Sequence, residues 1–134
     1  MSAAAAPIVY IIDDDDSVRA AIAALLKSVD LRSESFAAPD EFLRSKRLAG
    51  PSCIVLDVRL SGVSGLDVQR KLAAAGIQIP IIFITGQDDI PMALKKAMKE
   101  GAVELLTKPF RDEDLLDAIQ RALDQDRVES NPRE

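Results

Sequence analysis

The sequence predicts a doubly wound α/β domain built on a parallel sheet of five strands. Segments that are apolar at almost every position recur at 8–12, 53–56 and 79–84, and such segments are typical of central strands covered on both faces. Between them lie segments with the apolar spacing of amphipathic helices. The 134 residues suit one domain in which strand and helix alternate through right-handed crossovers.

The first half of the chain is expected to form three strands and three helices. Strand 8–12 precedes a helix whose apolar stripe consists of Val18, Ile22, Leu25, Leu26 and Val29. A more polar second strand is expected at 31–36, and a short helix at about 40–48. The third strand, 53–56, precedes a helix with a less regular stripe of Leu66, Leu72 and Ala73.

The second half is expected to form two further strands and two helices. Strand 79–84 precedes a helix with the apolar stripe Ile90, Ala93, Leu94, Ala97 and Met98. The fifth strand is expected at 102–106, and the last helix has the stripe Leu115, Leu116, Ile119, Ala122 and Leu123. We therefore expect a flexible segment at 1–6, a folded domain at 7–123, and a helix end with a terminal tail at 124–134.

Polarity along the strands predicts their order in the sheet. The second and fifth strands carry more polar residues than the other three, as edge strands do because one side faces water. The order 2-1-3-4-5 places both at the edges. In a sheet of this order, ligands bind beyond the carboxyl ends of strands 1 and 3.

Composition excludes several classes of site. The net charge is -5 and the sequence has no histidine, so we expect no nucleic-acid-binding surface, no Ser-His-Asp catalysis and no ordinary zinc site. The one cysteine, Cys53, lies in an apolar segment, which favours a buried thiol in a reducing compartment. The chain shows no signal-peptide pattern and no apolar stretch long enough to span a bilayer. We expect a cytoplasmic protein without membrane contact.

Acidic, hydroxyl and basic side chains follow four of the predicted strands. The first strand runs into the aspartates of 13–16, the third ends at Asp57, the fourth at Thr85, and the fifth is followed by Lys108. The carboxyl ends of parallel strands meet at one edge, so these groups are expected to share a crevice. Two carboxylates 4 Å apart repel by about 4 kcal/mol at an effective dielectric constant of 20. Such a cluster must therefore raise the pKa of a carboxyl or bind a cation. Oxygen ligands alone select a hard cation, and Mg²⁺ fits best.

Phosphoryl transfer suits these groups, since it needs mainly positioning and charge neutralisation. Asp57 is the candidate nucleophile, because it is the lone acid at the end of a central strand and a carboxylate needs no general base. Lys108 would contact one phosphate oxygen, and the Thr85 hydroxyl would donate a hydrogen bond to another.

The metal site is expected to use oxygen ligands from two strand ends. Asp13 and Asp14 would hold Mg²⁺ together with Asp57 and the backbone carbonyl of Arg59. Asp15 and Asp16 precede a helix, and N-capping with compensation of the helix dipole is the favoured role for both.

The sequence resembles the receiver domain of bacterial two-component response regulators, most of all its FixJ-type branch. The resemblance covers roughly 7–123 and is carried by the segments 9–19, 55–60, 64–65, 84–86, 90–93, 101–103 and 108–110. It implies a (βα)5 flavodoxin-like fold and phosphorylation of Asp57 by a sensor histidine kinase. It also implies a cis bond between Lys108 and Pro109. The domain would catalyse its own phosphorylation and dephosphorylation without being a turnover enzyme.

The resemblance further implies a switch. Phosphorylation would draw Thr85 inward and reshape the face made by the fourth helix, the fifth strand and the fifth helix. Leu105 stands where the family usually has an aromatic switch residue, so the usual coupling of threonine to an aromatic ring stays open.

The same face could form a homodimer by pairing opposite charges. The basic side chains are Lys95, Lys96 and Lys99, and the acidic ones are Asp112, Glu113, Asp114 and Asp117. Two solvated helix faces explain the pattern equally well. FixJ-type regulators carry a DNA-binding output domain after the receiver, and this sequence ends at Glu134. The output partner is therefore either another protein or such a domain.

Two other functions fit part of the pattern. A pseudo-receiver would be an interaction module that takes no phosphate, and Leu105 leaves that reading open. A haloacid dehalogenase-like phosphatase would use Asp13 as nucleophile in the segment 13–15.

Overall fold

The computed structural model describes residues 6–46, 50–57, 59–60, 63–85 and 104–130. The main sheet has the strands β1 (Ile8–Ile12), β2 (Arg32–Phe36), β3 (Ser52–Asp57), β6 (Ile81–Thr85) and β7 (Glu104–Thr107). The helices are α1 (Asp16–Ser28), α2 (Pro39–Arg44), α3 (Gly65–Ala74) and α5 (Asp112–Ser130). A two-stranded antiparallel pair, β4 (Arg59–Leu60) and β5 (Val63–Ser64), lies between β3 and α3.

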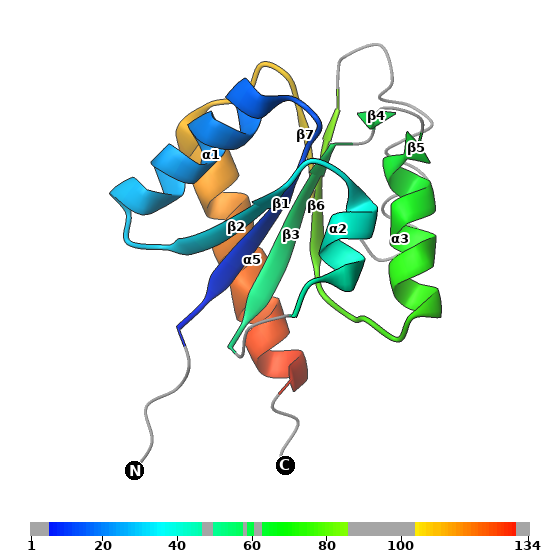
Figure 1. Ribbon diagram of the computed structural model, residues 1–134. Helices are drawn as coiled ribbons and strands as arrows, with labels where there is room; N and C mark the ends of the chain where they lie inside the picture. Colours follow the sequence, from blue (N-terminus) through cyan, green and yellow to red (C-terminus); the bar gives the residue numbers. More distant parts are fainter. Residues whose placement is uncertain (1–5, 47–49, 58, 61–62, 86–103, 131–134) are drawn as a thin grey trace.

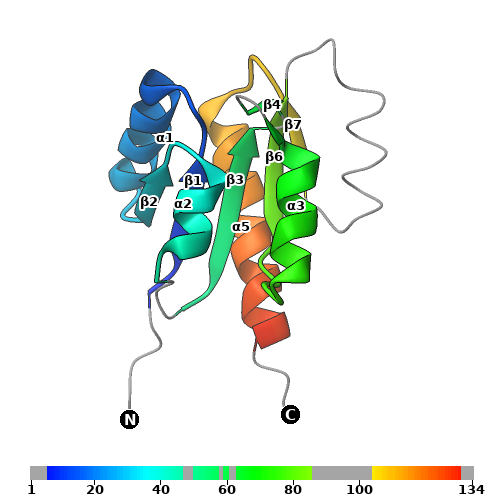
Figure 2. The same cartoon turned by 45° about the vertical axis from the view of Figure 1, so that its right-hand side comes forward.

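The strand order of the main sheet is β2-β1-β3-β6-β7, and every pairing in it is parallel. This confirms the predicted order 2-1-3-4-5, with both polar strands at the edges. Figures 1 and 2 show α1 and α5 on one face of the sheet and α2 and α3 on the other. The protein is therefore a doubly wound α/β domain of flavodoxin-like topology.

Side chains of the central strands divide between two apolar layers. Along β1, Val9 and Ile11 pack with α1 and α5, whereas Tyr10 and its neighbours Ile8 and Ile12 pack with α2 and α3. All five residues of β1 are buried. Both faces are covered, which explains why the sequence of this strand is apolar at every position.

Several element boundaries differ from those expected, among them those of β6 and α2. β6 begins at Ile81 rather than at residue 79, because Pro80 has no N–H for the ladder; the Pro80 carbonyl accepts from the Ile54 N–H at 2.9 Å. α2 ends at Arg44, where the backbone of Ser45 turns extended and its hydroxyl donates to the Phe42 carbonyl. α5 ends at Ser130, within the segment 124–134 where the helix end is expected.

The C-terminal part of α5 is anchored at the start of β3 by Asp126. The Ser52 backbone N–H donates to Asp126 Oδ2 at 2.8 Å, and Asp126 is 7% exposed. A buried N–H requires a partner, and here a side chain 74 residues away supplies it. Nearby Cys53 is also buried, and burial raises the pKa of its thiol to about 12.

The helix expected at 90–98 and its lysines lie outside the described residues. The proposed pairing of charges between that helix and α5 is therefore not tested by the structure. None of the helices in the described ranges is both long and apolar enough to cross a membrane.

Candidate functional site at the carboxyl ends of the strands

Strand register brings Asp13, Asp57, Thr85 and Lys108 to the carboxyl end of the sheet. Figure 1 shows β1, β3, β6 and β7 ending on that side of the domain. Ile12 lies beside Leu56, so the next residues, Asp13 and Asp57, leave neighbouring strands at the same level. Thr85 is the last residue of β6 and pairs with Thr107, which immediately precedes Lys108. For β1, β3 and β6 the local cause is the same: a buried apolar segment gives way to polar residues at the end of the strand.

Asp57 and Lys108 meet directly. Lys108 Nζ lies 3.5 Å from Asp57 Oδ2. The Asp57 side chain is 12% exposed and the Lys108 side chain 41% exposed, so the carboxylate is accessible from one side while the ammonium stays partly in water. The Lys108 backbone N–H also donates to the Thr85 carbonyl at 2.8 Å, and the bond from Lys108 to Pro109 is cis, as expected.

Asp13 lies buried beside this pair, with 3% of its surface exposed. Its Oδ1 accepts from the Asp15 N–H at 2.9 Å, and its own N–H donates to the Phe36 carbonyl at 3.1 Å. Burial raises the pKa of the Asp13 carboxyl; the Asp15 N–H lowers it, and the negative charges of Asp57 and Asp14 raise it further. Electrostatics thus links Asp13, Asp14, Asp57 and Lys108 in one site.

The donor chemistry of this site fits Mg²⁺. Within the described ranges, no three carboxylate or thiolate side chains converge closely enough to enclose a metal. Mg²⁺ typically takes one or two carboxylates and completes its shell with water and phosphate oxygens, so the aspartates of this site are suitable donors. Arg59, whose backbone carbonyl is the remaining predicted ligand, begins β4 two residues after Asp57.

Asp15 and Asp16 serve the helix, as predicted. Asp15 is the N-cap of α1: its Oδ1 accepts from the N–H groups of Ser17 at 2.8 Å and Val18 at 3.3 Å. The Ser17 hydroxyl donates to the same oxygen, and these bonds lower the pKa of the Asp15 carboxyl. Asp16 lies in the first turn and pairs with Arg19.

The two switch candidates have different surroundings. Thr85 is 1% exposed. Leu105 is half-buried in β7 and packs against the apolar layer that contains Phe83, its neighbour in register on β6. The side chain at this position thus contacts the core of the sheet.

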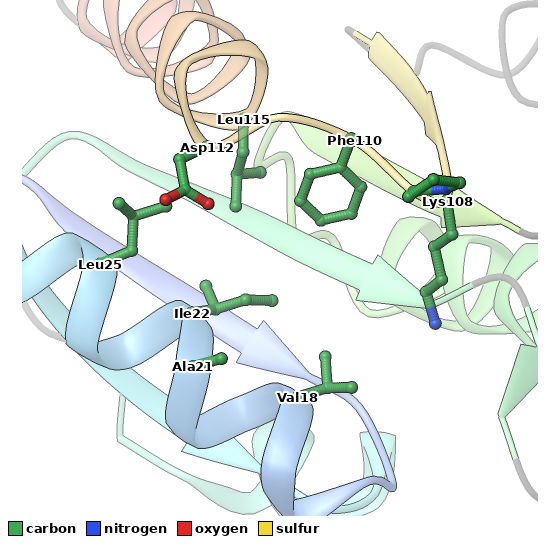
Figure 3. Close-up of a pocket in the computed structure, with 9 residues that line it drawn as sticks. Val18, Ala21, Ile22, Leu25, Lys108, Phe110, Asp112 and Leu115 are labelled. Atoms are coloured by element: carbon green, nitrogen blue, oxygen red, sulfur yellow. The ribbon is translucent and has the colours of Figure 1, made fainter.

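Sequence reasoning missed two features beside the site. One is Arg19, whose guanidinium lies against the acidic loop. The other is a groove of about 340 Å³ between α1 and α5. Figure 3 shows Lys108 at one end of this groove, reaching toward the end of β3. The groove is lined by Val18, Ala21, Ile22, Leu25, Lys108, Pro109, Phe110, Asp112 and Leu115. The apolar stripe of α1 includes both core and groove positions, and nothing in its spacing separates the two.

Known proteins with similar sequences point to one family. Residues 9–120 match the model of the response regulator receiver domain. The chain is 53% identical over 116 residues to the response regulator protein TmoT of Ectopseudomonas mendocina, covering 87% of this chain and 52% of that one. It is 40% identical over 115 residues to the transcriptional regulatory protein FixJ of Azorhizobium caulinodans, covering 86% and 54%.

A solved structure agrees with the match. The response regulator StyR superposes with a TM-score of 0.86 and 42% identity, over 95% of this chain and 64% of that one. The chain spans about half the length of the curated relatives that it matches.

Proposed function

The chain belongs to the family of response regulator receiver domains of two-component systems, and from this premise we propose that Asp57 accepts a phosphoryl group from a sensor histidine kinase. The observation that carries the proposal is the ion pair between Lys108 and Asp57 beside the buried Asp13. In this pair the accessible carboxylate of Asp57 lies next to a positive charge, the Lys108 ammonium, which would stabilise a phosphoryl group.

The proposed transfer exchanges one bond to phosphorus for another. An Asp57 carboxylate oxygen forms the new O–P bond while the P–N bond to the kinase histidine breaks, and the imidazole leaves with the electron pair. Asp13, Asp14, Asp57 and the Arg59 carbonyl would hold Mg²⁺, which would neutralise charge on the phosphoryl oxygens. Lys108, whose Nζ lies 3.5 Å from Asp57 Oδ2, would neutralise a further oxygen.

Signal output is proposed to depend on Thr85 and β7. The Thr85 hydroxyl would donate to the phosphoryl group, and the hydrogen bond from Lys108 N–H to the Thr85 carbonyl ties the two switch segments together. Leu105 would follow Thr85 by packing rather than through an aromatic ring. Such a two-state rearrangement is how a local charge change reaches a distant face.

The groove between α1 and α5 is the proposed contact for the kinase. It is largely apolar, and Lys108 links it to Asp57. A kinase segment seated there would bring its phosphohistidine to the carboxylate. We place this exchange in the cytoplasm. We also propose that the receiver acts on an output partner, which is either a further domain or another protein. A homodimer through α5 is part of the same proposal.

A pseudo-receiver is the second candidate, and Leu105 is the observation that favours it. Incubation with a small acyl phosphate separates the two. The proposed function predicts a gain of one phosphoryl group in the intact mass with Mg²⁺ present and none in EDTA. A chain that stays unmodified in both conditions would be an interaction module instead.

A further inference from the structure

Arg19 contacts both ends of the acidic loop 13–16. One guanidinium nitrogen, Nη1, donates to the Asp13 backbone carbonyl at 2.6 Å. The other, Nη2, bonds the Asp16 carboxylate. The Arg19 side chain is 17% exposed, whereas that of Asp16 is 92% exposed. The guanidinium is thus packed under the loop rather than extended into solvent.

Neither bond of Arg19 uses a carboxylate proposed to bind the metal. The guanidinium contacts the carbonyl of Asp13 and the carboxylate of Asp16. Lys108 behaves differently, since it reaches the Asp57 carboxylate itself. Arg19 therefore acts on the backbone of the loop.

The backbone contact determines where the next side chain leaves the chain. A peptide unit is planar, so holding the Asp13 carbonyl also fixes the peptide plane that leads to the Asp14 Cα. The Asp13 carboxylate is oriented separately by the Asp15 N–H. Two anchors thus set the two carboxylates, and only a planar fork with several donors can span both contacts made by Arg19.

We propose that Arg19 is a positioning residue for the Mg²⁺ site: it holds the loop 13–16 so that Asp13 and Asp14 present their carboxylates to the metal. The inference rests on the proposed function. It assigns to α1 a part in building the site as well as in covering the sheet.

The sign of the effect distinguishes positioning from charge. If Arg19 acted only as a nearby positive charge, removing it would tighten Mg²⁺ binding, because a cation would meet less repulsion. If Arg19 positions the ligands, removing it weakens binding, and outer contacts of this kind are commonly worth about tenfold or more in metal affinity.

Mg²⁺ titration by calorimetry of the full chain and of Arg19→Gln tests the proposal, with Lys27→Gln as the control. Lys27 is an exposed cation in the last turn of the same helix. We expect a dissociation constant raised about tenfold in Arg19→Gln and unchanged in Lys27→Gln. Arg19→Lys keeps the charge and loses the fork, so it should weaken binding too; it decides the question if Arg19→Gln does not fold.

A metal-free measurement accompanies the titration. Amide hydrogen exchange at Asp15, whose N–H is bonded to Asp13, should speed up in Arg19→Gln and not in Lys27→Gln. Equal or tighter Mg²⁺ binding by both Arg19 variants overturns this inference alone. A wild-type chain that binds no Mg²⁺ overturns the proposed function and this inference together.

Discussion

Lys108 and Asp57 form an ion pair at 3.5 Å although 51 residues separate them in the chain. The pair exists because β3 and β7 both end at the same edge of the sheet, with β6 between them. The strand order of the fold therefore brings these two residues of the site together.

Replacing Lys108 with methionine should slow phosphorylation while leaving the fold intact. The ammonium is the positive charge nearest to Asp57 among the described contacts, and loss of one such stabilising donor typically costs a factor of about 100 or more in rate. Uptake from a small acyl phosphate measures the effect. Lys71→Met is the matched control, because Lys71 pairs with Asp40 on the surface at 3.9 Å. Equal rates in both variants would remove Lys108 from the site.

Asp13→Asn should stabilise the metal-free domain at neutral pH. The folded state raises the pKa of Asp13 above its ordinary 3.8, chiefly through burial, so the folded state binds the proton more tightly than the unfolded state. Stability from this group is complete below pH 3.8 and is lost as the pH rises through the folded pKa. Asparagine cannot ionise and still accepts from the Asp15 N–H.

Urea unfolding of Asp13→Asn and wild type at several pH values checks this. The variant should have the larger free energy of unfolding at pH 7, and the difference from wild type should become smaller in acid. Mg²⁺ should raise the melting temperature of the wild type alone. Asp117→Asn, an exposed change in α5, controls for net charge. A variant less stable than wild type at neutral pH would contradict the assignment.

Ala21→Glu should impair transfer from a kinase without affecting the chemistry. Ala21 lines the groove between α1 and α5, and a carboxylate there would have to be desolvated under a docked partner. Ala24→Glu adds the same charge to the same helix outside the groove lining. Transfer is measured with a phosphorylated histidine kinase that labels the wild type. We expect slower transfer in Ala21→Glu only, with unchanged uptake from acyl phosphate in both variants; slow uptake from acyl phosphate would point to damage at the site.

Asp126→Ala should destabilise the domain by about 1–3 kcal/mol, since it leaves the buried Ser52 N–H without this acceptor. Asp126→Asn keeps an oxygen at the position and should cost less. Denaturant unfolding gives the free energies, and amide exchange at Ser52 reports the bond itself. Unchanged protection of the Ser52 amide in Asp126→Ala would show that the bond is dispensable.

Most of the sheet could be predicted because a strand buried on both faces is apolar at almost every position. β1 was located to the residue, and the polar edge strands gave the order. The convergence of Asp13, Asp57, Thr85 and Lys108 followed from that order, since each one follows or ends a strand.

The features that were missed depend on contacts between distant residues. Asp126 looks like one more acid in a polar helix end, and only the packing of α5 on β3 gives it the Ser52 N–H. Arg19 reads as a solvated residue on a helix, because its contact with the Asp13 carbonyl involves a backbone atom that carries no sequence signal. β4 and β5 have two residues each, which is too short to show the alternation of apolar and polar residues that marks a strand.

The most direct test of the account is to identify the phosphorylated residue. Wild-type chain labelled by an acyl phosphate with Mg²⁺ is trapped with borohydride and sequenced by tandem mass spectrometry. We expect modification at Asp57, and none in Asp57→Asn although that variant remains folded. A label on Asp13, or one that persists in Asp57→Asn, would contradict the account and favour the phosphatase-like chemistry of a strand 1 nucleophile.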